Sequence, residues 1–283
     1  MSEACGSCPS ASSCSSTQGA CPSEPQLTKA QEASNVKNVI VVMSGKGGVG
    51  KSSVTSMLAV SLKRQGYNVG ILDADITGPS IPKVFGIQEK AKVNETGVIP
   101  AETSLGIKIM SVNLLLPNEG DPVIWRGSLI TQMVRQFWTD VIWGELDYLI
   151  IDLPPGTGDV PISLFQSLPV SGVVIVTSPQ QLAGMIVRKA INMVKKYDAP
   201  ILGLIENMAY VSCTHCDEKI EVFGKPQGEE EAAKNQIPYL GQLPIDSKFT
   251  SLSDSGKIEE YKGEIFDRIA QDMVKELNKV AAK

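Results

Sequence analysis

The chain has 283 residues, of which 42% are hydrophobic and 20% charged, as is usual for a globular protein with a large core. Its net charge of −5 and the lack of a Lys/Arg cluster argue against nucleic acid as a partner, because phosphate-backbone binding needs clustered positive charge. No apolar run is long enough to span a bilayer and no secretory signal is seen, so we expect a cytoplasmic protein without a membrane partner, whose cysteines are thiols or metal ligands.

Residues 1–36 contain many small and polar residues and few large apolar ones, which predicts a flexible tail. Four of the six cysteines lie in this tail with the spacing C-x2-C-x5-C-x6-C, namely Cys5, Cys8, Cys14 and Cys21. Four thiolates suit zinc or an iron-sulfur cluster, either of which would order the tail around itself. The alternative is an unstructured tail that binds no metal.

Residues 37–283 alternate between short apolar runs and amphipathic segments. Strands are predicted at 39–43, 68–72, 107–112, 148–151, 173–177, 201–205 and 239–243, with helices after the glycine loop and at 127–141, 160–168, 181–196, 228–235 and 262–279. This alternation predicts a single α/β domain with a mostly parallel sheet of about 7–8 strands and helices on both faces. Ligands of such sheets bind at the carboxyl ends of the strands.

A glycine loop at 44–53 follows the first strand and opens the first helix. It matches the pattern G-x-x-x-x-G-K-[ST] at Gly45, Gly50, Lys51 and Ser52. Glycines let successive backbone N–H groups turn inward, and the helix N-terminus adds partial positive charge, so the loop is a seat for polyphosphate. We expect Lys51 to reach the β- and γ-phosphates and the Ser52 hydroxyl to ligate Mg²⁺.

A second lysine, Lys46, follows the first glycine of this loop. Two close lysines repel one another unless phosphate oxygens receive both charges. The run K-G-G-V-G-K-S resembles the deviant Walker A loop of the MinD/ParA/nitrogenase-iron-protein class, in which the extra lysine reaches the nucleotide of a dimer partner. The resemblance therefore implies a nucleotide-bridged homodimer, while the alternative is a solvated loop lysine.

Acidic residues follow two of the predicted strands. Asp152 ends the apolar run at 148–151 and has the position of a Walker B carboxylate that holds Mg²⁺ through water. Asp75 follows the strand at 68–72 and is a candidate for orienting the attacking water. Gly156 lies in a Pro- and Gly-rich loop typical of a switch that senses the γ-phosphate. Each aspartate has a structural alternative as a helix cap or turn former.

A C-x-x-C pair, Cys213 and Cys216, lies in a predicted loop and hairpin insert at 208–225. Zinc or a cubane cluster needs four ligands, and a two-fold dimer would supply the missing two. A zinc site across a dimer and a thioredoxin-like redox pair are alternatives. His215, the single histidine, is expected beside the metal or in solvent rather than as a ligand.

Several segments together resemble the Mrp/ApbC family of iron-sulfur carrier ATPases: GKGGVGKS, DADITGPSIP, WRG at 125–127, DLPPGTGD, TSPQ at 177–180 and ENM at 206–208. The resemblance runs from about residue 37 to the end of the chain. It implies that Asp75 is the switch I carboxylate, that Asp152 and Gly156 belong to the second switch, and that Asn207 reads adenine. It implies a nucleotide site lined by Gly45, Lys46, Gly47, Gly48, Val49, Gly50, Lys51, Ser52 and Ser53. Thr77 stands where the family usually has an aromatic residue, and Trp125 and Arg126 match the family.

The same resemblance implies a slow, Mg²⁺-dependent ATPase whose dimer holds one [4Fe-4S] cluster between Cys213 and Cys216 of both subunits and passes it to apo-proteins. A related ATPase is a second candidate partner. Eukaryotic cytosolic relatives have a tail motif that includes C-x2-C-x5-C, which Cys5, Cys8 and Cys14 reproduce, although the family's fourth cysteine lies upstream and Cys21 lies downstream. The main rival is a spatial-organising ATPase of the MinD/ParA kind, which does not need the C-x-x-C pair.

Overall fold

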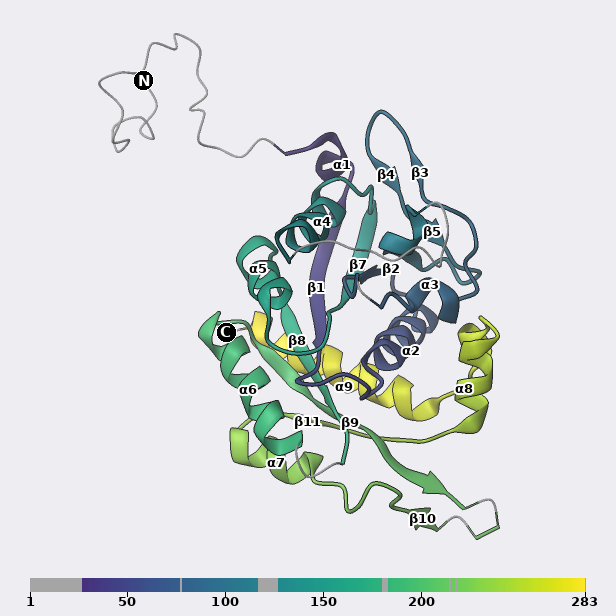
Figure 1. Cartoon of the computed structure of the whole chain (residues 1–283), viewed down its shortest axis with the longest axis vertical. Coiled ribbons are helices and arrows are strands. Elements are labelled where there is room, and N and C mark those ends of the chain that lie inside the picture. Colours follow the sequence, from purple (N-terminus) through teal and green to yellow (C-terminus); the bar gives the residue numbers. More distant parts are fainter. Residues whose placement is uncertain are drawn as a thin grey trace, which may run out of the picture.

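The computed structural model describes residues 27–76, 78–116, 127–179, 183–213, 215–216 and 218–282. A mostly parallel sheet forms the centre of the described chain, in the order β10-β9-β8-β1-β7-β2-β6-β5, with β11 also paired to β9 (Figure 1). Its strands are β1 Asn35–Met43, β2 Val69–Asp73, β5 Ala101–Glu102, β6 Lys108–Ser111, β7 Glu145–Asp152, β8 Gly172–Thr177, β9 Ile201–Ser212, β10 Lys219–Ile220 and β11 Tyr239–Pro244. The antiparallel pairs are β5 with β6 and β10 with β9.

Helices cover both faces of this sheet (Figure 1). One face packs on α2 (Lys51–Arg64) and α9 (Glu264–Ala281), and the other on α4 (Gly127–Thr139), α5 (Asp159–Ser167) and α6 (Ala183–Lys196). The remaining described elements are α1 Lys29–Glu32, β3 Lys92–Val93, β4 Val98–Ile99, α3 Ile81–Val84, α7 Gly228–Asn235, α8 Ser247–Asp254 and the 3-10 turns Val112–Leu114 and Ile258–Glu260. Among the described residues, no helix has the length and apolar character needed to cross a membrane.

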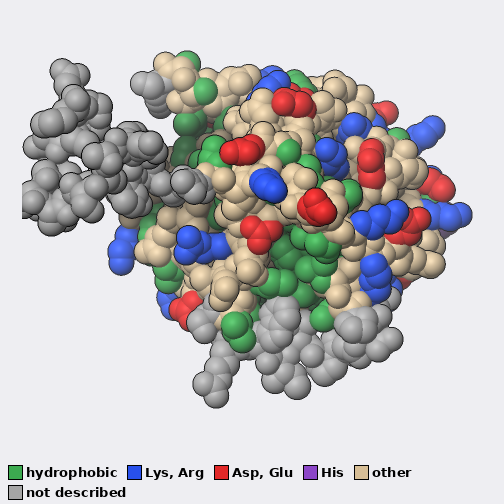
Figure 2. Space-filling model, turned by 90° about the horizontal axis from the view of Figure 1, so that it is seen from above, with side chains coloured by type: hydrophobic (Ala, Val, Ile, Leu, Met, Phe, Trp, Pro, Cys, Tyr) green, Lys and Arg blue, Asp and Glu red, His purple; other side chains and the backbone are tan. Residues whose placement is uncertain are grey.

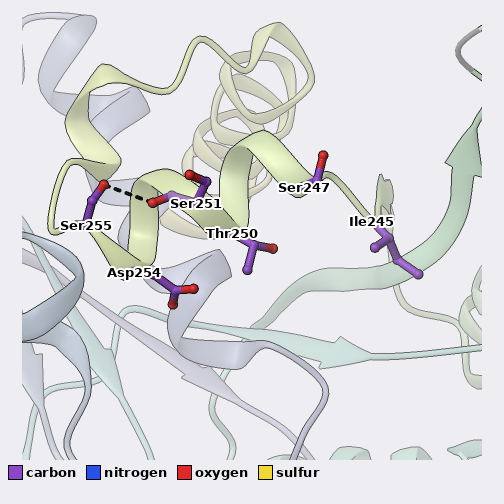
Figure 3. Close-up of a pocket in the computed structure, with 6 residues that line it drawn as sticks. All are labelled: Ile245, Ser247, Thr250, Ser251, Asp254 and Ser255. Atoms are coloured by element: carbon purple, nitrogen blue, oxygen red, sulfur yellow. Dashed lines mark hydrogen bonds between the residues drawn. The ribbon is translucent and has the colours of Figure 1, made fainter.

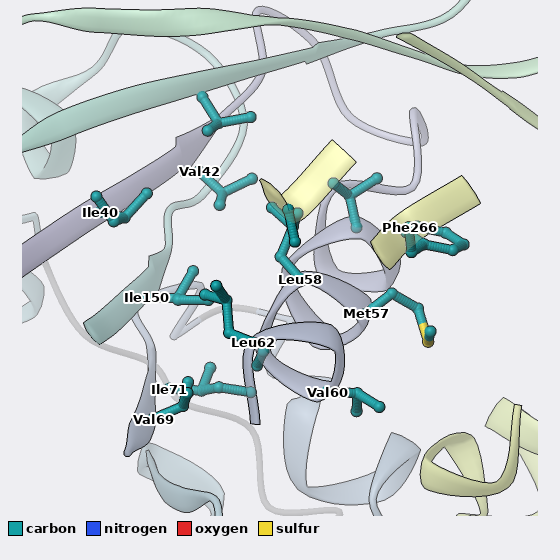
Figure 4. Close-up of a cluster of buried hydrophobic side chains, with 14 of the residues drawn as sticks. Ile40, Val42, Met57, Leu58, Val60, Leu62, Val69, Ile71, Ile150 and Phe266 are labelled. Carbon is teal, nitrogen blue, oxygen red and sulfur yellow. The ribbon is translucent and has the colours of Figure 1, made fainter. Parts of the chain in front are cut away.

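Strand β1 shows why the strands read as continuous apolar runs. Ile40 and Val42 enter the core between the sheet and α2, while Val39, Val41 and Met43 enter the core on the opposite face. Figure 4 shows the first of these cores, where side chains of α2 lie between the strands and α9. Successive residues of a strand face opposite sides, so a central strand covered on both faces must be apolar at every position.

The predicted α/β fold with a mostly parallel sheet is confirmed, and the sheet has nine strands in the described residues because short β5 and β10 add to its edges. The predicted tail, 1–36, is too long at its C-terminal end. Thr28 forms a capping box with Gln31 at the start of α1, and Ala30 is buried. Strand β1 then begins at Asn35, which pairs with Glu145 of β7.

Other differences concern elements with weak local signals. The sequence did not predict helices α3 and α8 or the β3–β4 hairpin. These elements have two to eight residues, which is too few to show a recognisable hydrophobic periodicity. Strand β9 runs to Ser212, well beyond the predicted end at 205. Several residues singled out above lie outside the described residues, namely Cys5, Cys8, Cys14, Cys21, Thr77, Trp125 and Arg126.

Candidate functional site

The glycine loop joins β1 to α2 at the carboxyl edge of the sheet. Gly48 and Gly50 both have φ of +77°, a region that residues with a Cβ rarely adopt. Gly50 is the N-cap of α2, so the first N–H groups of a 14-residue helix open toward the loop. A Cβ on Gly45 would lie 2.2 Å from Ile186 Cγ2, and one on Gly50 would lie 2.2 Å from Asn207 Nδ2. The loop is thus closely packed from behind and has the form of an anion seat.

The first turn of α2 converges on Asp152. Lys51 Nζ lies 2.8 Å from Asp152 Oδ1, and the Thr55 hydroxyl donates to the same oxygen at 3.0 Å. The Ser52 hydroxyl donates to Asp152 Oδ2 at 2.5 Å. These contacts follow from the sheet order, because β7 pairs with β1 and sets Asp152 opposite Val42.

Ser52 Oγ and Asp152 Oδ2 are therefore neighbouring oxygen atoms, and oxygen is the type of ligand atom that Mg²⁺ prefers. Lys51 is buried, with 6% of its side chain exposed, and its charge is balanced by the Asp152 carboxylate. Incoming phosphate oxygens would offer Lys51 an alternative anionic partner. Thr55 was missed by the sequence analysis because it lies outside the motif, one helical turn after Lys51.

Asp73, at the end of β2, is a buried carboxyl group that the motifs did not single out. It pairs in register with Asp152 on β7 and accepts hydrogen bonds from Ser111 Oγ at 3.2 Å and from the Ile81 amide at 3.3 Å. Burial, and then the nearby Asp152 charge, raise the pKa of Asp73 to about 8. Only the side-by-side pairing of β2 and β7 shows that these two acids are neighbours.

The two switch segments take different positions relative to the glycine loop. Gly156, with φ of +93°, donates its amide to the Ser44 carbonyl at 2.9 Å, so the second switch contacts the loop directly. Asp75 is half-buried just beyond β2, and its amide donates to Asp73 Oδ1 at 3.2 Å. Since β7 lies between β2 and β1, Asp75 stands one strand further from the loop than Asp152. Lys46 is also half-buried, and its carbonyl accepts from Ser44 Oγ at 2.9 Å.

Strand β9 contributes Asn207 to the back of the glycine loop. Asn207 Nδ2 donates to the Val49 carbonyl at 2.9 Å, and the side chain is buried. This contact gives Asn207 a role in positioning the loop, and its predicted contact with adenine stays a prediction. The preceding residue, Glu206, accepts from the Gln227 amide at 2.9 Å at the start of α7, and burial raises its pKa.

The same strand ends at the C-x-x-C pair. The ladder between β9 and β10 continues one step further, because the Cys213 amide donates to the Glu218 carbonyl at 2.8 Å. Cys213 is half-buried and Cys216 exposed, on a hairpin that projects from the body of the molecule (Figure 1). Hydrogen bonds from the His215 amide, the Cys216 thiol and the Cys216 amide lower the pKa of Cys213, which favours the thiolate that metals bind.

Within the described residues, no three His, Cys, Asp or Glu side chains are grouped closely enough to hold a metal ion. Cys213 and Cys216 lie within one turn of the hairpin, and their expected part in binding a metal stays a prediction. His215 is exposed, and its place between the two thiols gives no further ligand cluster.

Two surface features lie apart from these residues. An open groove of about 680 Å³ follows β11 and runs along α8, lined by Ile245, Thr250, Asp254 and three serines (Figure 3). It contains none of the predicted phosphate-binding residues. On the face shown in Figure 2, acidic and basic side chains are interspersed. That face carries no single-sign field of the kind that attracts a nucleic acid backbone.

Comparisons with known proteins place the chain in a family. A family model described as NUBPL iron-transfer P-loop NTPase matches residues 35–278. An iron-sulfur cluster carrier protein of Clostridium perfringens is 45% identical over 270 residues, covering 92% of this chain and 95% of that protein. The cytosolic Fe-S cluster assembly factor CFD1 of Yarrowia lipolytica is 46% identical over 262 residues, covering 88% and 90%.

Solved structures extend the likeness to three dimensions. A nucleotide-binding protein of Archaeoglobus fulgidus in complex with ADP shares 45% identity and superposes with a TM-score of 0.75, covering 85% of this chain and 96% of that one. The cell division ATPase MinD of Pyrococcus furiosus has a TM-score of 0.61 at 22% identity, covering 84% and 99%, which shows a shared fold. The resemblance drawn from the motifs is confirmed: the chain belongs to the family of NUBPL iron-transfer P-loop NTPases.

Proposed function

We propose that this protein is an ATP-hydrolysing carrier that assembles a [4Fe-4S] cluster between two subunits and transfers it to apo-proteins. The observation that carries the proposal is the course of β9. This one strand contacts the glycine loop through Asn207 and then runs to Cys213 at its end. The relatives named as iron-sulfur cluster carriers support this assignment.

Nucleotide binding and hydrolysis would use side chains and backbone amides at the carboxyl edge of the sheet. Backbone amides of the loop and Lys51 would bind the phosphates, and Ser52 with Asp152 would hold Mg²⁺. Bound Mg²⁺ would neutralise charge that develops on the phosphates during transfer. Asp75 would orient the attacking water, and Gly156 would respond to the γ-phosphate because its amide already bonds to the loop.

The cluster is the cargo of this reaction, and a second subunit would complete its ligand set. Two thiols on one hairpin supply half of a four-ligand set, and a two-fold axis brings the same pair from the partner. Lys46 would reach the partner's nucleotide, so ATP would draw the subunits together and hydrolysis would loosen them. A cluster held at the same interface would then be bound or released according to the nucleotide state.

Anaerobic reconstitution with iron and sulfide tests the assignment. The wild-type chain is expected to give the absorption and EPR signals of a [4Fe-4S] cluster in a dimer, in addition to any cluster on the tail. Replacing Cys213 and Cys216 by Ala should remove the dimer cluster, while Ala at Cys5, Cys8, Cys14 and Cys21 should leave it in place. A colourless dimer that retains zinc through Cys213 would refute cluster transfer.

A further inference from the structure

The hairpin that carries the cysteines has two unlike faces. On one face, Lys219 Nζ lies 4.3 Å above the centre of the Tyr210 ring, with Ser212 opposite Lys219 in the β9–β10 pair. This cation–π contact covers the aromatic ring and leaves a polar surface. The polar face therefore needs no partner to bury apolar area.

The other face is apolar and holds Cys213. Ile220 pairs with Val211, and alternation along β9 puts Cys213 on the same side as Val211. Ile220 is 51% exposed, and the turn that follows exposes Val222 at 55% and Phe223 at 41%. Three large apolar side chains within four residues of the hairpin are thus open to solvent. Ile220 lies two residue pairs from Cys213, and Val222 and Phe223 follow Ile220 on the side away from the cysteines. Large apolar side chains exposed so close together in the chain are typical of an interaction site.

We propose that Ile220, Val222 and Phe223 form an apolar collar that packs against the same hairpin of a second copy of this chain and encloses the shared cluster. The proposal rests on the proposed function: among the described residues Cys213 and Cys216 make up half of a four-ligand set, and a second copy of the chain would complete it. A two-fold contact that joins Cys213 and Cys216 of both subunits would also set the apolar faces of the two hairpins side by side, with Ile220 the nearest of the three to the cysteines. The collar would exclude water and chelators from the cluster and would stabilise a hairpin that is only two strands wide.

The β3–β4 hairpin offers a matched control. It also exposes apolar side chains, with Val93 71% exposed and Ile99 42% exposed, but it bears no cysteine. The test uses two double variants of the full chain. The collar variant combines Ile220→Ser and Val222→Ser, and the control variant combines Val93→Ser and Ile99→Ser. Urea unfolding should show equal stability of the two monomers, since all four side chains are at least partly solvated.

Sedimentation velocity and cluster loss to an iron chelator are then measured on the reconstituted proteins. The collar variant is expected to dimerise about 10- to 100-fold more weakly and to lose its cluster correspondingly faster, while the control variant matches the wild type. Equal behaviour of the two variants would overturn the collar and leave the carrier function standing. A collar variant that keeps its dimer and cluster but transfers the cluster more slowly would assign the surface to the acceptor protein and also overturn it. A wild-type chain that binds no bridging cluster would instead refute the proposed function itself.

Discussion

Replacing Gly50 by alanine is expected to destabilise the nucleotide-free protein more than the same replacement at Gly48. The two glycines have the same φ of +77°, so the backbone cost of adding a Cβ is similar at both positions. They differ in what the added Cβ meets. At Gly48 nothing lies within 4 Å, whereas at Gly50 the Cβ would lie 2.2 Å from Asn207 Nδ2.

The expected losses of stability follow from the backbone conformation and from the contact that the added Cβ makes. A non-glycine residue in the left-handed region costs about 1–2 kcal/mol, and loss of glycine's freedom in the unfolded chain returns about 0.4–1 kcal/mol. Gly48→Ala should therefore cost about 1 kcal/mol. In Gly50→Ala the Asn207 amide must also leave the Val49 carbonyl, and a buried polar group without its partner costs about 1–3 kcal/mol more.

Urea unfolding of the metal-free and nucleotide-free chain measures this difference directly. Asn207→Ala serves as the second arm of a double-mutant cycle, because it removes the obstructing amide. The excess cost of Gly50→Ala over Gly48→Ala should largely disappear in the Asn207→Ala background. Equal losses at the two glycines, or an excess that persists without the amide, would refute the claim that Asn207 braces the loop.

Three further outcomes are expected. Asp152→Ala should lower the free energy of unfolding in urea by about 3–5 kcal/mol, because it leaves the buried Lys51 charge without its partner. Asp272→Ala, in an exposed helical ion pair, should lower it by less than about 1 kcal/mol. Similar losses in the two variants would contradict a buried Lys51–Asp152 ion pair. The pKa of Asp73 is raised from 3.8 to about 8, so the native apo state binds more protons than the unfolded state between these values and stability falls as pH rises through them. Asp73→Asn should flatten the dependence of stability on pH, and an unchanged pH dependence would contradict the raised pKa of Asp73. Lys46→Ala should lower ATP turnover about a thousandfold with most nucleotide binding retained, and normal hydrolysis would exclude a role for Lys46 across the dimer.

Much of the site was predictable because its signals are local. The glycine loop needs Gly45, Gly50, Lys51 and Ser52 at fixed spacing between a strand and a helix, and the structure has that arrangement. The aspartate at the end of an apolar run was expected near the loop, and Asp152 contacts both Lys51 and Ser52. Short-range spacing carries this information because a motif of ten residues has few ways to fold.

Contacts between distant segments were not predictable in the same way. Asp73 stands two residues before Asp75 and belongs to no motif of its own, although it is the acid that pairs with Asp152 and has a raised pKa. Its importance depends on β2 lying next to β7, and apolar periodicity does not state the order of strands in a sheet. Helix α1 falls within the predicted tail, because its anchoring contact is the hydrogen bond from the Thr28 hydroxyl to the carbonyl of Thr139, more than a hundred residues away.

By itself, therefore, the sequence determined the fold class, the phosphate-binding loop and the presence of the C-x-x-C pair. Only the tertiary structure shows that one strand, β9, connects the phosphate-binding loop with the C-x-x-C pair. Asn207 of β9 supports the glycine loop, and Cys213 follows the end of the strand. The reason is physical. Local patterns specify which backbone each segment adopts, while the pairing of strands decides which side chains share a position in space.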